Sequence, residues 1–267
     1  MTQTPVPKLR ADDLHKRFGS RVVLNGVSFS VAPGESLVIV GPSGSGKSVL
    51  MKHLIGLIQP ESGGVFVDGS DFWAESNVGR SALRKKFGMS FQEGALFDSM
   101  SVSENVAFAL RRSGRPPAEI QARVEECLEI VHLPDVGKKR PSELSGGMRR
   151  RVGFARAIAH QPEILLFDEP NTGLDPIMTD IIDDVILQMR ERLHASIVTI
   201  THHMPSARKI GDRVALLYGG HIIYEATPEE FLRAGDPAVR QFVEGRASGP
   251  LTEESARVLA GVHVGGA

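Results

Sequence analysis

The sequence predicts an α/β fold in which buried strands alternate with helices. Three short apolar runs without polar alternation, SLVIV at 36–40, ILLF at 164–167 and SIVTI at 196–200, are typical of strands covered on both faces. A glycine-rich loop and a helical apolar pattern follow the first run. At about 94–160 two amphipathic helical patterns replace this alternation, so the sequence predicts a helical insertion within the α/β core.

Length, charge and cysteine content narrow the class of protein. A chain of 267 residues is long enough for one large domain with a small appendage. Its 31 Lys and Arg against 32 Asp and Glu argue against a nucleic-acid binder that depends on a basic surface. The single Cys127 cannot form an internal disulfide, which fits a reducing compartment. The apolar runs fall short of the ~18 residues of a spanning helix, so we expect a soluble protein.

The N-terminal third predicts short strands on either side of the glycine loop. Residues 22–24 and 27–31 are mostly apolar and flank Asn25-Gly26, which is typical of a β-hairpin. Further strands are predicted at 63–69 and 86–92. Beyond them, Ser101-x-x-Glu104 has the form of a capping box at the start of the first inserted helix.

The C-terminal part predicts a return to strands and helices. We expect a helix from about Pro176 to Leu193, and a closing hairpin in which Gly219-Gly220 joins RVALLY to HIIY. Thr227 as N-cap and Asp236-Pro237 start two short helices. The second carries the apolar stripe Val239, Phe242 and Val243. The last ~20 residues, rich in Ala, Gly and Ser, predict loose structure.

Residues 41–48, GPSGSGKS, predict a phosphate-binding loop. They match G-x-x-x-x-G-K-[ST] and lie between a buried strand and a helix. Glycines allow successive N–H groups to point into one concavity, at the positive end of the helix. Lys47 is expected to reach the β and γ phosphates, and the Ser48 hydroxyl to bind an octahedral Mg²⁺. The expected ATP contacts are Gly41, Pro42, Ser43, Gly44, Ser45, Gly46, Lys47 and Ser48.

Two acidic residues complete this prediction. ILLF places Asp168 and Glu169 at the carboxyl end of a buried strand, which is where α/β sheets bind ligands. We expect Asp168 to hold Mg²⁺ through water and Glu169 to polarise the attacking water. These residues therefore predict a P-loop protein that binds a nucleoside triphosphate and Mg²⁺ at this site.

Five motifs in order resemble those of the ATP-binding cassette (ABC) ATPases. After the phosphate loop, Gln92 matches the Q-loop, ELSGGMRRRVGFARAIA at 143–159 the signature, NTGLDP at 171–176 the D-loop and His202 the switch histidine. The resemblance implies a P-loop NTPase (RecA-like) core with a β-rich N-terminal subdomain, the inserted helical subdomain and a short C-terminal helical extension. On this basis the ABC ATPase domain spans 8–226 and the extension 227–267.

The resemblance also implies a role for each motif. Phe18 takes the place of the aromatic residue that stacks on adenine, and Gln92 binds Mg²⁺ and reports occupancy to a transport partner. His202 contacts the γ-phosphate, and Asp175 communicates across a dimer. In the family two cassettes sandwich two ATP molecules, so the helix start at Ser145, Gly146 and Gly147 binds nucleotide held by a second copy.

Several residues depart from the family or invite other interpretations. Met148 replaces the commonest glutamine of the signature, and His203 stands where aspartate is usual. His202 and His203 do not suggest zinc, because neighbours on an extended strand point to opposite faces. Some of Arg149, Arg150 and Arg151 are interpreted as a solvated helix face. Cys127 is interpreted as a small core residue.

Three stretches resemble, more narrowly, the MlaF-type ATPase of the Mla/MCE phospholipid transport systems. They are residues 91–110, the signature segment and DPAVRQFVEGRASGP at 236–250. This resemblance implies a homodimer at the cytoplasmic face of the inner membrane, with a permease of the MlaE type and an MCE-domain protein of the MlaD type. A STAS-domain subunit of the MlaB type accompanies them in some systems, and no nucleic-acid partner is expected.

Alternatives stay open at this point. The chain could serve another ABC transporter, such as an amino-acid importer, or a non-transport ABC ATPase of the cell-division type. The apolar residues Ala95, Leu96, Phe97 and Met100 could be core or a docking surface for the permease. The helix that begins at Asp236 could pack on its own domain or cross to a second subunit.

Overall fold

Two β-sheets and the helices around them form the part of the chain that the computed structural model describes, residues 6–91, 94–112 and 114–252. The first elements in chain order are β1 (Leu9–Phe18), β2 (Arg21–Val31), β3 (Ser36–Val40), α1 (Lys47–Leu54), β4 (Ser62–Val67), β5 (Ser70–Asp71), α2 (Asn77–Arg84), β6 (Phe87–Ser90), α3 (Val102–Ala107), the 3₁₀ helix η1 (Leu110–Arg112) and α4 (Pro117–Ile130). They are followed by η2 (Pro141–Glu143), α5 (Gly146–Ile158), β7 (Ile164–Asp168), α6 (Pro176–Leu193), β8 (Ser196–Ile200), α7 (Met204–Ile210), β9 (Arg213–Tyr218), β10 (His221–Ala226), α8 (Pro228–Arg233) and α9 (Pro237–Glu244).

The larger sheet has six strands in the order β10-β9-β3-β8-β7-β6. Its strands pair in parallel from β9 to β6, and β10 is an antiparallel edge strand. Every residue of β3 and β8 is buried, which confirms the strands predicted from apolar runs. Alternate residues face two different hydrophobic cores: Leu37 packs with α1 on one side, and Val38 with α7 and its neighbours on the other.

The smaller sheet is antiparallel, in the order β2-β1-β4-β5, and corrects one prediction. The hairpin expected around Asn25-Gly26 is wrong, because β2 runs unbroken and pairs with β1. Leu14 pairs with Val27 and His15 with Asn25, so Gly26 is an extra residue in β2. Its φ of 91° is one that glycine tolerates, and the glycine signal therefore marks a β-bulge.

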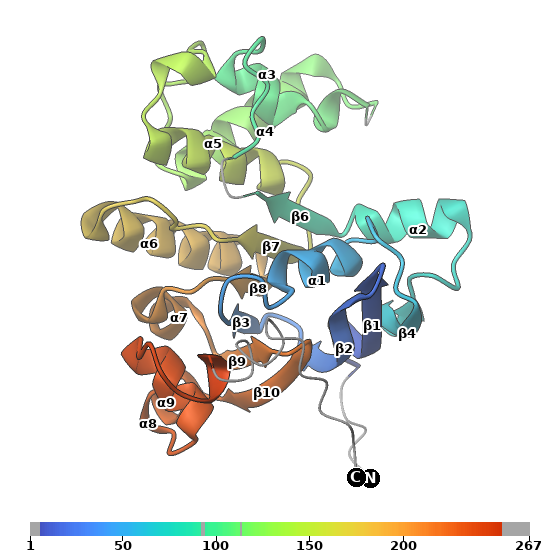
Figure 1. The fold of residues 1–267 in the computed structure, drawn as a ribbon. Coiled ribbons are helices and arrows are strands. Elements are labelled where there is room, and N and C mark those ends of the chain that lie inside the picture. The colour runs from blue at the N-terminus through green and yellow to red at the C-terminus, as the bar shows by residue number, and fades with distance from the viewer. Residues whose placement is uncertain (1–5, 92–93, 113, 253–267) are drawn as a thin grey trace, which may run out of the picture.

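Figure 1 shows α3, α4 and α5 grouped beyond β6, at the opposite end of the molecule from α8 and α9. The predicted capping box is confirmed: Glu104 N–H donates to Ser101 Oγ, and Ser101 N–H donates to Glu104 Oε2. The first inserted helix is shorter than predicted, because α3 ends at Ala107 and a 3₁₀ turn follows. Cys127 is fully buried in α4, and burial raises the pKa of its thiol to about 12, as expected for a core residue.

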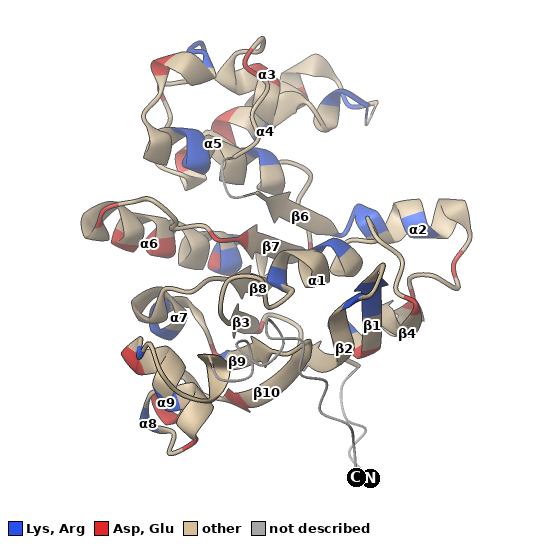
Figure 2. Ribbon diagram, in the orientation of Figure 1, with Lys and Arg blue, Asp and Glu red and all other residues tan. Residues whose placement is uncertain are grey.

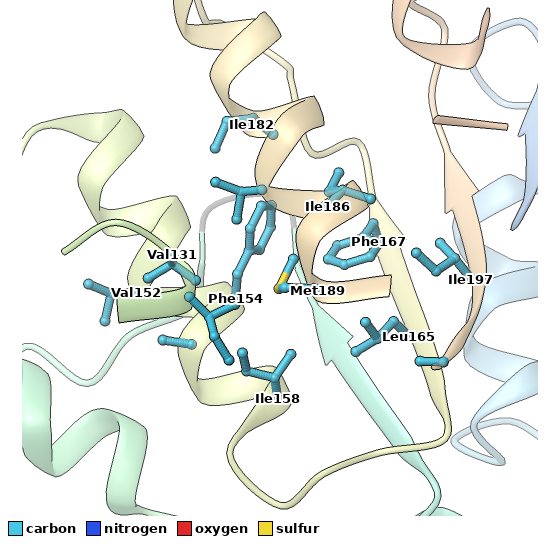
Figure 3. Packing of buried hydrophobic residues seen from close by; sticks show 14 of the residues in the cluster. Val131, Val152, Phe154, Ile158, Leu165, Phe167, Ile182, Ile186, Met189 and Ile197 are labelled. Atoms are coloured by element: carbon cyan, nitrogen blue, oxygen red, sulfur yellow. The ribbon is translucent and has the colours of Figure 1, made fainter. Parts of the chain in front are cut away.

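Aromatic packing joins this helical group to the larger sheet. Figure 3 shows Phe154 of α5 and Phe167 of β7 beside Ile186 and Met189 of α6. The two phenylalanine rings are 5.1 Å apart in an edge-to-face arrangement, and both side chains are fully buried. This packing therefore fixes α5 against β7 and α6.

The C-terminal helices pack on the same chain. The β9–β10 hairpin is confirmed, and Thr227 and Glu230 form a capping box at α8. In α9, Val239 is fully buried in the core of this chain, so that helix packs on its own domain. The tail then returns to the hairpin, where Tyr218 Oη donates to the Leu251 carbonyl at 2.7 Å. Most of the segment predicted to be loosely structured lies outside the described residues.

Within the described ranges, none of the helices has both the length and the apolar character that a membrane crossing requires.

The Phe154 contact generates a stability prediction. Phe154→Ala should lower the free energy of unfolding by about 3–5 kcal/mol, because it removes a fully buried ring from a packed core. Urea denaturation followed by circular dichroism measures the change. Val78→Ala, at a side chain that is 81% exposed, is the matched control and should stay within about 0.5 kcal/mol of the unmodified chain. A loss below about 1 kcal/mol for Phe154→Ala would contradict this packing.

Candidate active site

The loop at 41–48 joins the buried strand β3 to α1 and is packed too closely for side chains at two glycines. A Cβ atom at Gly41 would lie 2.3 Å from the Leu217 carbonyl oxygen, and one at Gly46 would lie 2.9 Å from that of Val23. Gly46 also has a φ of 103° as the N-cap of α1. The loop therefore wraps around the helix start, as an anion-binding loop requires.

The Lys47 side chain turns back into this loop. Its ammonium donates to the carbonyl oxygens of Gly41 at 2.7 Å and Pro42 at 2.9 Å, and only 8% of the residue is exposed. Burial lowers the pKa of Lys47, while the nearby carboxylates of Glu169 and Asp168 oppose that change. The structure thus places a cation within the concavity that the sequence predicts.

Asp168 ends β7 and lies beside Ser48. The Ser48 hydroxyl lies close enough to this carboxylate to favour its charged form, whereas the buried Oδ1 atom has no hydrogen-bond partner among the described residues. Burial, and secondly the charge of Glu169, raise the pKa of Asp168. An unsatisfied carboxylate oxygen and a hydroxyl are the oxygen donors that a largely hydrated Mg²⁺ accepts, so these residues fit that ion.

Glu169 and His202 meet at the edge of the sheet. His202 Nδ1 lies 2.8 Å from Glu169 Oε2, and the Thr172 hydroxyl donates to the same oxygen at 3.3 Å. Glu169 has a φ of 50°, a left-handed conformation that costs a residue with a side chain about 1–3 kcal/mol. Its N–H donates to the Ile200 carbonyl, which ties the strained turn to β8.

Lys47, Ser48, Glu169 and His202 line one cavity of about 600 Å³, within the size range of small-molecule sites. Gly41 and Asp168 are not among its described lining residues. Phe18 lies on its wall and is half exposed. The sequence did not predict Arg21, which reaches Gly44 O at 3.5 Å only because β2 pairs with β1. The described lining comprises Phe18, Arg21, Val23, Ser43, Gly44, Gly46, Lys47, Ser48, Val49, Glu169, Thr172 and His202.

The signature segment lies apart from that cavity. Ser145, Gly146 and Gly147 start α5, where Ser145 Oγ accepts from Met148 N–H at 3.3 Å. A Cβ atom at Gly147 would lie 2.5 Å from Met178 Cε, so this glycine allows α5 to approach α6 closely. Asp175 caps α6 and accepts from Met178 N–H at 2.9 Å. None of Ser145, Gly146, Gly147 and Asp175 is among the described residues that line the cavity. Gln92 lies outside the described residues.

The structure gives roles to His203 and to the three consecutive arginines at 149–151. His203 is the N-cap of α7, where its Nδ1 lies 3.3 Å from Ser206 N. The solvated-face interpretation fits Arg149, which is exposed, but not Arg150, which is buried and donates to carbonyls of the turn after Glu169. Arg149 and Arg151 also donate to backbone carbonyls, so each of these three consecutive arginines holds a neighbouring segment. Figure 2 shows basic residues interspersed with acidic ones over the ribbon.

Comparison with known proteins agrees with this geometry. The family model described as ABC transporter matches residues 24–172. The chain is 39% identical over 270 residues to the "Probable ribonucleotide transport ATP-binding protein mkl" of Mycobacterium tuberculosis, covering 97% of this chain and 75% of the relative. It is 44% identical to "Methionine import ATP-binding protein MetN" of Caulobacter vibrioides, covering 88% and 70%. It is 38% identical to "Intermembrane phospholipid transport system ATP-binding protein MlaF" of Haemophilus influenzae, covering 87% and 89%.

A solved structure has the same fold. The ATP-binding cassette MJ0796, in a dimeric post-hydrolysis state bound to ADP and Pi, superimposes with a TM-score of 0.75 at 29% identity. The alignment covers 82% of this chain and 98% of that one.

The raised pKa of Asp168 generates a prediction about stability. Asp168→Asn should raise the melting temperature of the nucleotide-free protein at neutral pH, because it removes a buried charge that Glu169 repels. A gain of about 1 kcal/mol corresponds to roughly 2–4 °C at this chain length. The gain should be complete above the folded-state pKa of Asp168, shrink as the pH falls through it, and vanish below the unfolded-state pKa, because the carboxyl is then protonated in both states. Differential scanning calorimetry measures it, with exposed Asp135→Asn as the control. An unchanged or lower melting temperature at neutral pH would contradict the assignment.

Proposed function

The chain belongs to the ABC transporter family and is an ATPase, and from this premise we propose that it powers phospholipid movement between inner and outer membranes. The observation that carries the hydrolytic role is the 2.8 Å contact between His202 and Glu169 at the mouth of the phosphate-loop cavity. We assign the ABC ATPase domain to 8–226, with its helical subdomain at about 94–160. The C-terminal extension is 227–267.

We assign nucleotide binding to the cavity wall. The exposed Phe18 ring stacks on adenine, and the N–H groups of 41–48 bind the phosphates with Lys47. Lys47 now bonds two loop carbonyls, so phosphate oxygens replace those acceptors when ATP enters.

The proposed hydrolysis uses Glu169 as the base that polarises water, and His202 to hold its carboxylate in place. Bound Mg²⁺ neutralises charge on the phosphates. Ser48 and Asp168 hold it, the latter through water, and Gln92 is proposed as a further ligand. The left-handed backbone of Glu169 aims the carboxylate away from β7 toward His202.

The proposed working form is a homodimer with two ATP molecules between the subunits. Ser145 and Gly146 are exposed at the start of α5 and are not among the residues that line the cavity of their own chain. A helix start with exposed N–H groups binds anions, so this surface suits the nucleotide of a second copy. Asp175, at the start of α6 beside it, is proposed to communicate between the two sites.

A permease is proposed to dock on the helical subdomain. Phe97 and Phe108 are 41% and 37% exposed, and their rings lie 4.7 Å apart. Together with Leu96 and Met100 they offer an apolar patch of the kind that protein partners cover. We propose a permease of the MlaE type, an MCE-domain protein of the MlaD type and, in some systems, a STAS subunit of the MlaB type. Bound to them, the chain would lie at the cytoplasmic face of the inner membrane.

Support for phospholipid as cargo comes from the three stretches described above and from the Haemophilus influenzae relative. A second candidate is import of an amino acid, which the 44% identity to a methionine import protein favours. The cargo experiment below separates them.

The role of Glu169 predicts the behaviour of Glu169→Gln. ATP turnover should fall about 100-fold or more, since general-base catalysis contributes about 10²–10⁴-fold, while ATP binding persists and a closed dimer accumulates. Phosphate release and size-exclusion chromatography with ATP measure the two effects. Glu163→Gln, at an exposed glutamate just before the start of β7, is the control and should keep turnover within about twofold. Unchanged turnover in Glu169→Gln would remove Glu169 from this role.

The cargo proposal predicts which proteins and lipids accompany the chain. Affinity purification from the native membrane should yield an MCE-domain protein and a permease, and lipid extraction should yield phospholipid. Phe97→Ser with Phe108→Ser should release the permease about tenfold more readily while leaving nucleotide binding unchanged, because these rings lie outside the ATP cavity. Recovery of an amino-acid permease without an MCE-domain protein would favour the importer.

A further inference from the structure

A buried arginine links the signature helix to the turn that carries Glu169. Arg150 lies in α5 and is 9% exposed. Its Nη1 donates to the Pro170 carbonyl at 2.7 Å, and its Nη2 donates to the Thr172 carbonyl at 2.8 Å. The two ends of one planar guanidinium therefore hold two carbonyls of a single turn.

Thr172 extends this connection to the carboxylate. Its hydroxyl donates to Glu169 Oε2 at 3.3 Å, and its N–H donates to the Glu169 carbonyl at 3.3 Å. The same Oε2 atom faces His202 Nδ1 at 2.8 Å. An unbroken series of hydrogen-bond contacts thus runs from α5 through Thr172 to the carboxylate of Glu169, which faces the cavity.

The turn needs such support because its backbone is strained. A left-handed Glu169 persists only where surrounding contacts determine it. The Asn171 side chain supplies a second anchor, since its Nδ2 donates to Asp183 Oδ1 at 2.8 Å and to Ser206 Oγ at 2.7 Å. The helices α6 and α7 therefore hold the side chain of the turn, while α5 holds its carbonyls.

We propose that Arg150 is a positioning residue for hydrolysis, which fixes Glu169 through Thr172 and transmits displacement of the signature segment to it. The proposal rests on the proposed function, in which residues 145–147 bind the nucleotide of a second copy. Arg150 lies one helical turn beyond that segment. When residues 145–147 of one chain bind the nucleotide held by the second copy, their displacement therefore reaches Glu169 of the same chain, which serves the nucleotide in that chain's own cavity. Lysine cannot replace this planar fork, because one ammonium does not present two parallel N–H donors.

The neighbouring residue offers a matched control. Arg151 is also partly buried in α5 and donates to two backbone carbonyls, those of Val131 and His132. Those carbonyls lie at the end of α4 and not in the Glu169 turn. A single nitrogen of Arg151, Nη1, makes both contacts. Arg151→Lys therefore makes the same substitution in the same helix and alters side chain–carbonyl contacts that lie outside the turn.

The experiment is steady-state ATP hydrolysis by the full-length chain. Arg150→Lys should lower kcat about tenfold and leave the KM for ATP within about twofold, whereas Arg151→Lys should leave both within about twofold. Thr172→Val should lower kcat similarly. The double variant should be no slower than the slower single variant, because both changes interrupt one connection.

Several results would overturn the proposal. For Arg150→Lys, these are an unchanged kcat or a raised KM in place of a lowered kcat. For the control, it is a loss of kcat in Arg151→Lys equal to that in Arg150→Lys. For the double variant, it is a fall in kcat equal to the product of the two single effects. Thr172→Val keeps the test available if Arg150→Lys does not fold. Glu169→Gln is measured in parallel: if it keeps full turnover, the proposed function fails, whereas a dead Glu169→Gln beside a normal Arg150→Lys sinks only the present inference.

Discussion

The parallel register of β3, β8 and β7 determines where the site can form. Ile39 and Asp168 both pair with Ile200, so the three strands end at one level. The phosphate loop, the acidic pair and the segment carrying His202 all leave the sheet from that edge. Backbone pairing, set by buried apolar residues, therefore brings together side chains that are far apart in the sequence.

The site places groups in environments that oppose folding. Asp168 is held beside Glu169 in a buried position, Lys47 loses hydration, and Glu169 adopts a left-handed backbone. These unfavourable environments are tolerated because the hydrophobic cores on the two faces of the larger sheet are extensive. Active sites are locally unstable for this reason: their charged groups and backbone are arranged to bind a ligand, and that arrangement lowers the stability of the folded chain.

Much of the fold was predictable because its main signals are local. The apolar runs of β3, β7 and β8, the helix Pro176–Leu193 and the caps at Ser101 and Thr227 depend on neighbouring residues alone. The hairpin at Asn25-Gly26 failed because a glycine at positive φ serves a bulge as well as a turn, and only pairing with β1 decides between them.

The phosphate loop and the acidic pair were also predictable, since each follows a buried strand. Arg21 could not be found in this way, because strand pairing brings it to Gly44. The contacts of Arg150 were equally hidden, because Pro170 and Thr172 are twenty or more residues away. Arg149 and Arg151, which flank Arg150 in α5, donate to other segments of the chain.

The arginines of α5 show how one helix serves several parts of the molecule. Arg149 holds the Leu144 carbonyl at its start, Arg151 holds the end of α4, and Arg156 donates to the Gly94 and Ala95 carbonyls beyond the Q-loop position. The aromatic contact of Phe154 fixes the same helix on β7. These contacts tie α5 to the segment before it, to the end of α4 and to residues 94–95, so a displacement of the helix disturbs several hydrogen bonds at once. In this fold, then, the segment proposed to meet a second subunit and the apolar patch proposed to meet a permease are mechanically connected through α5.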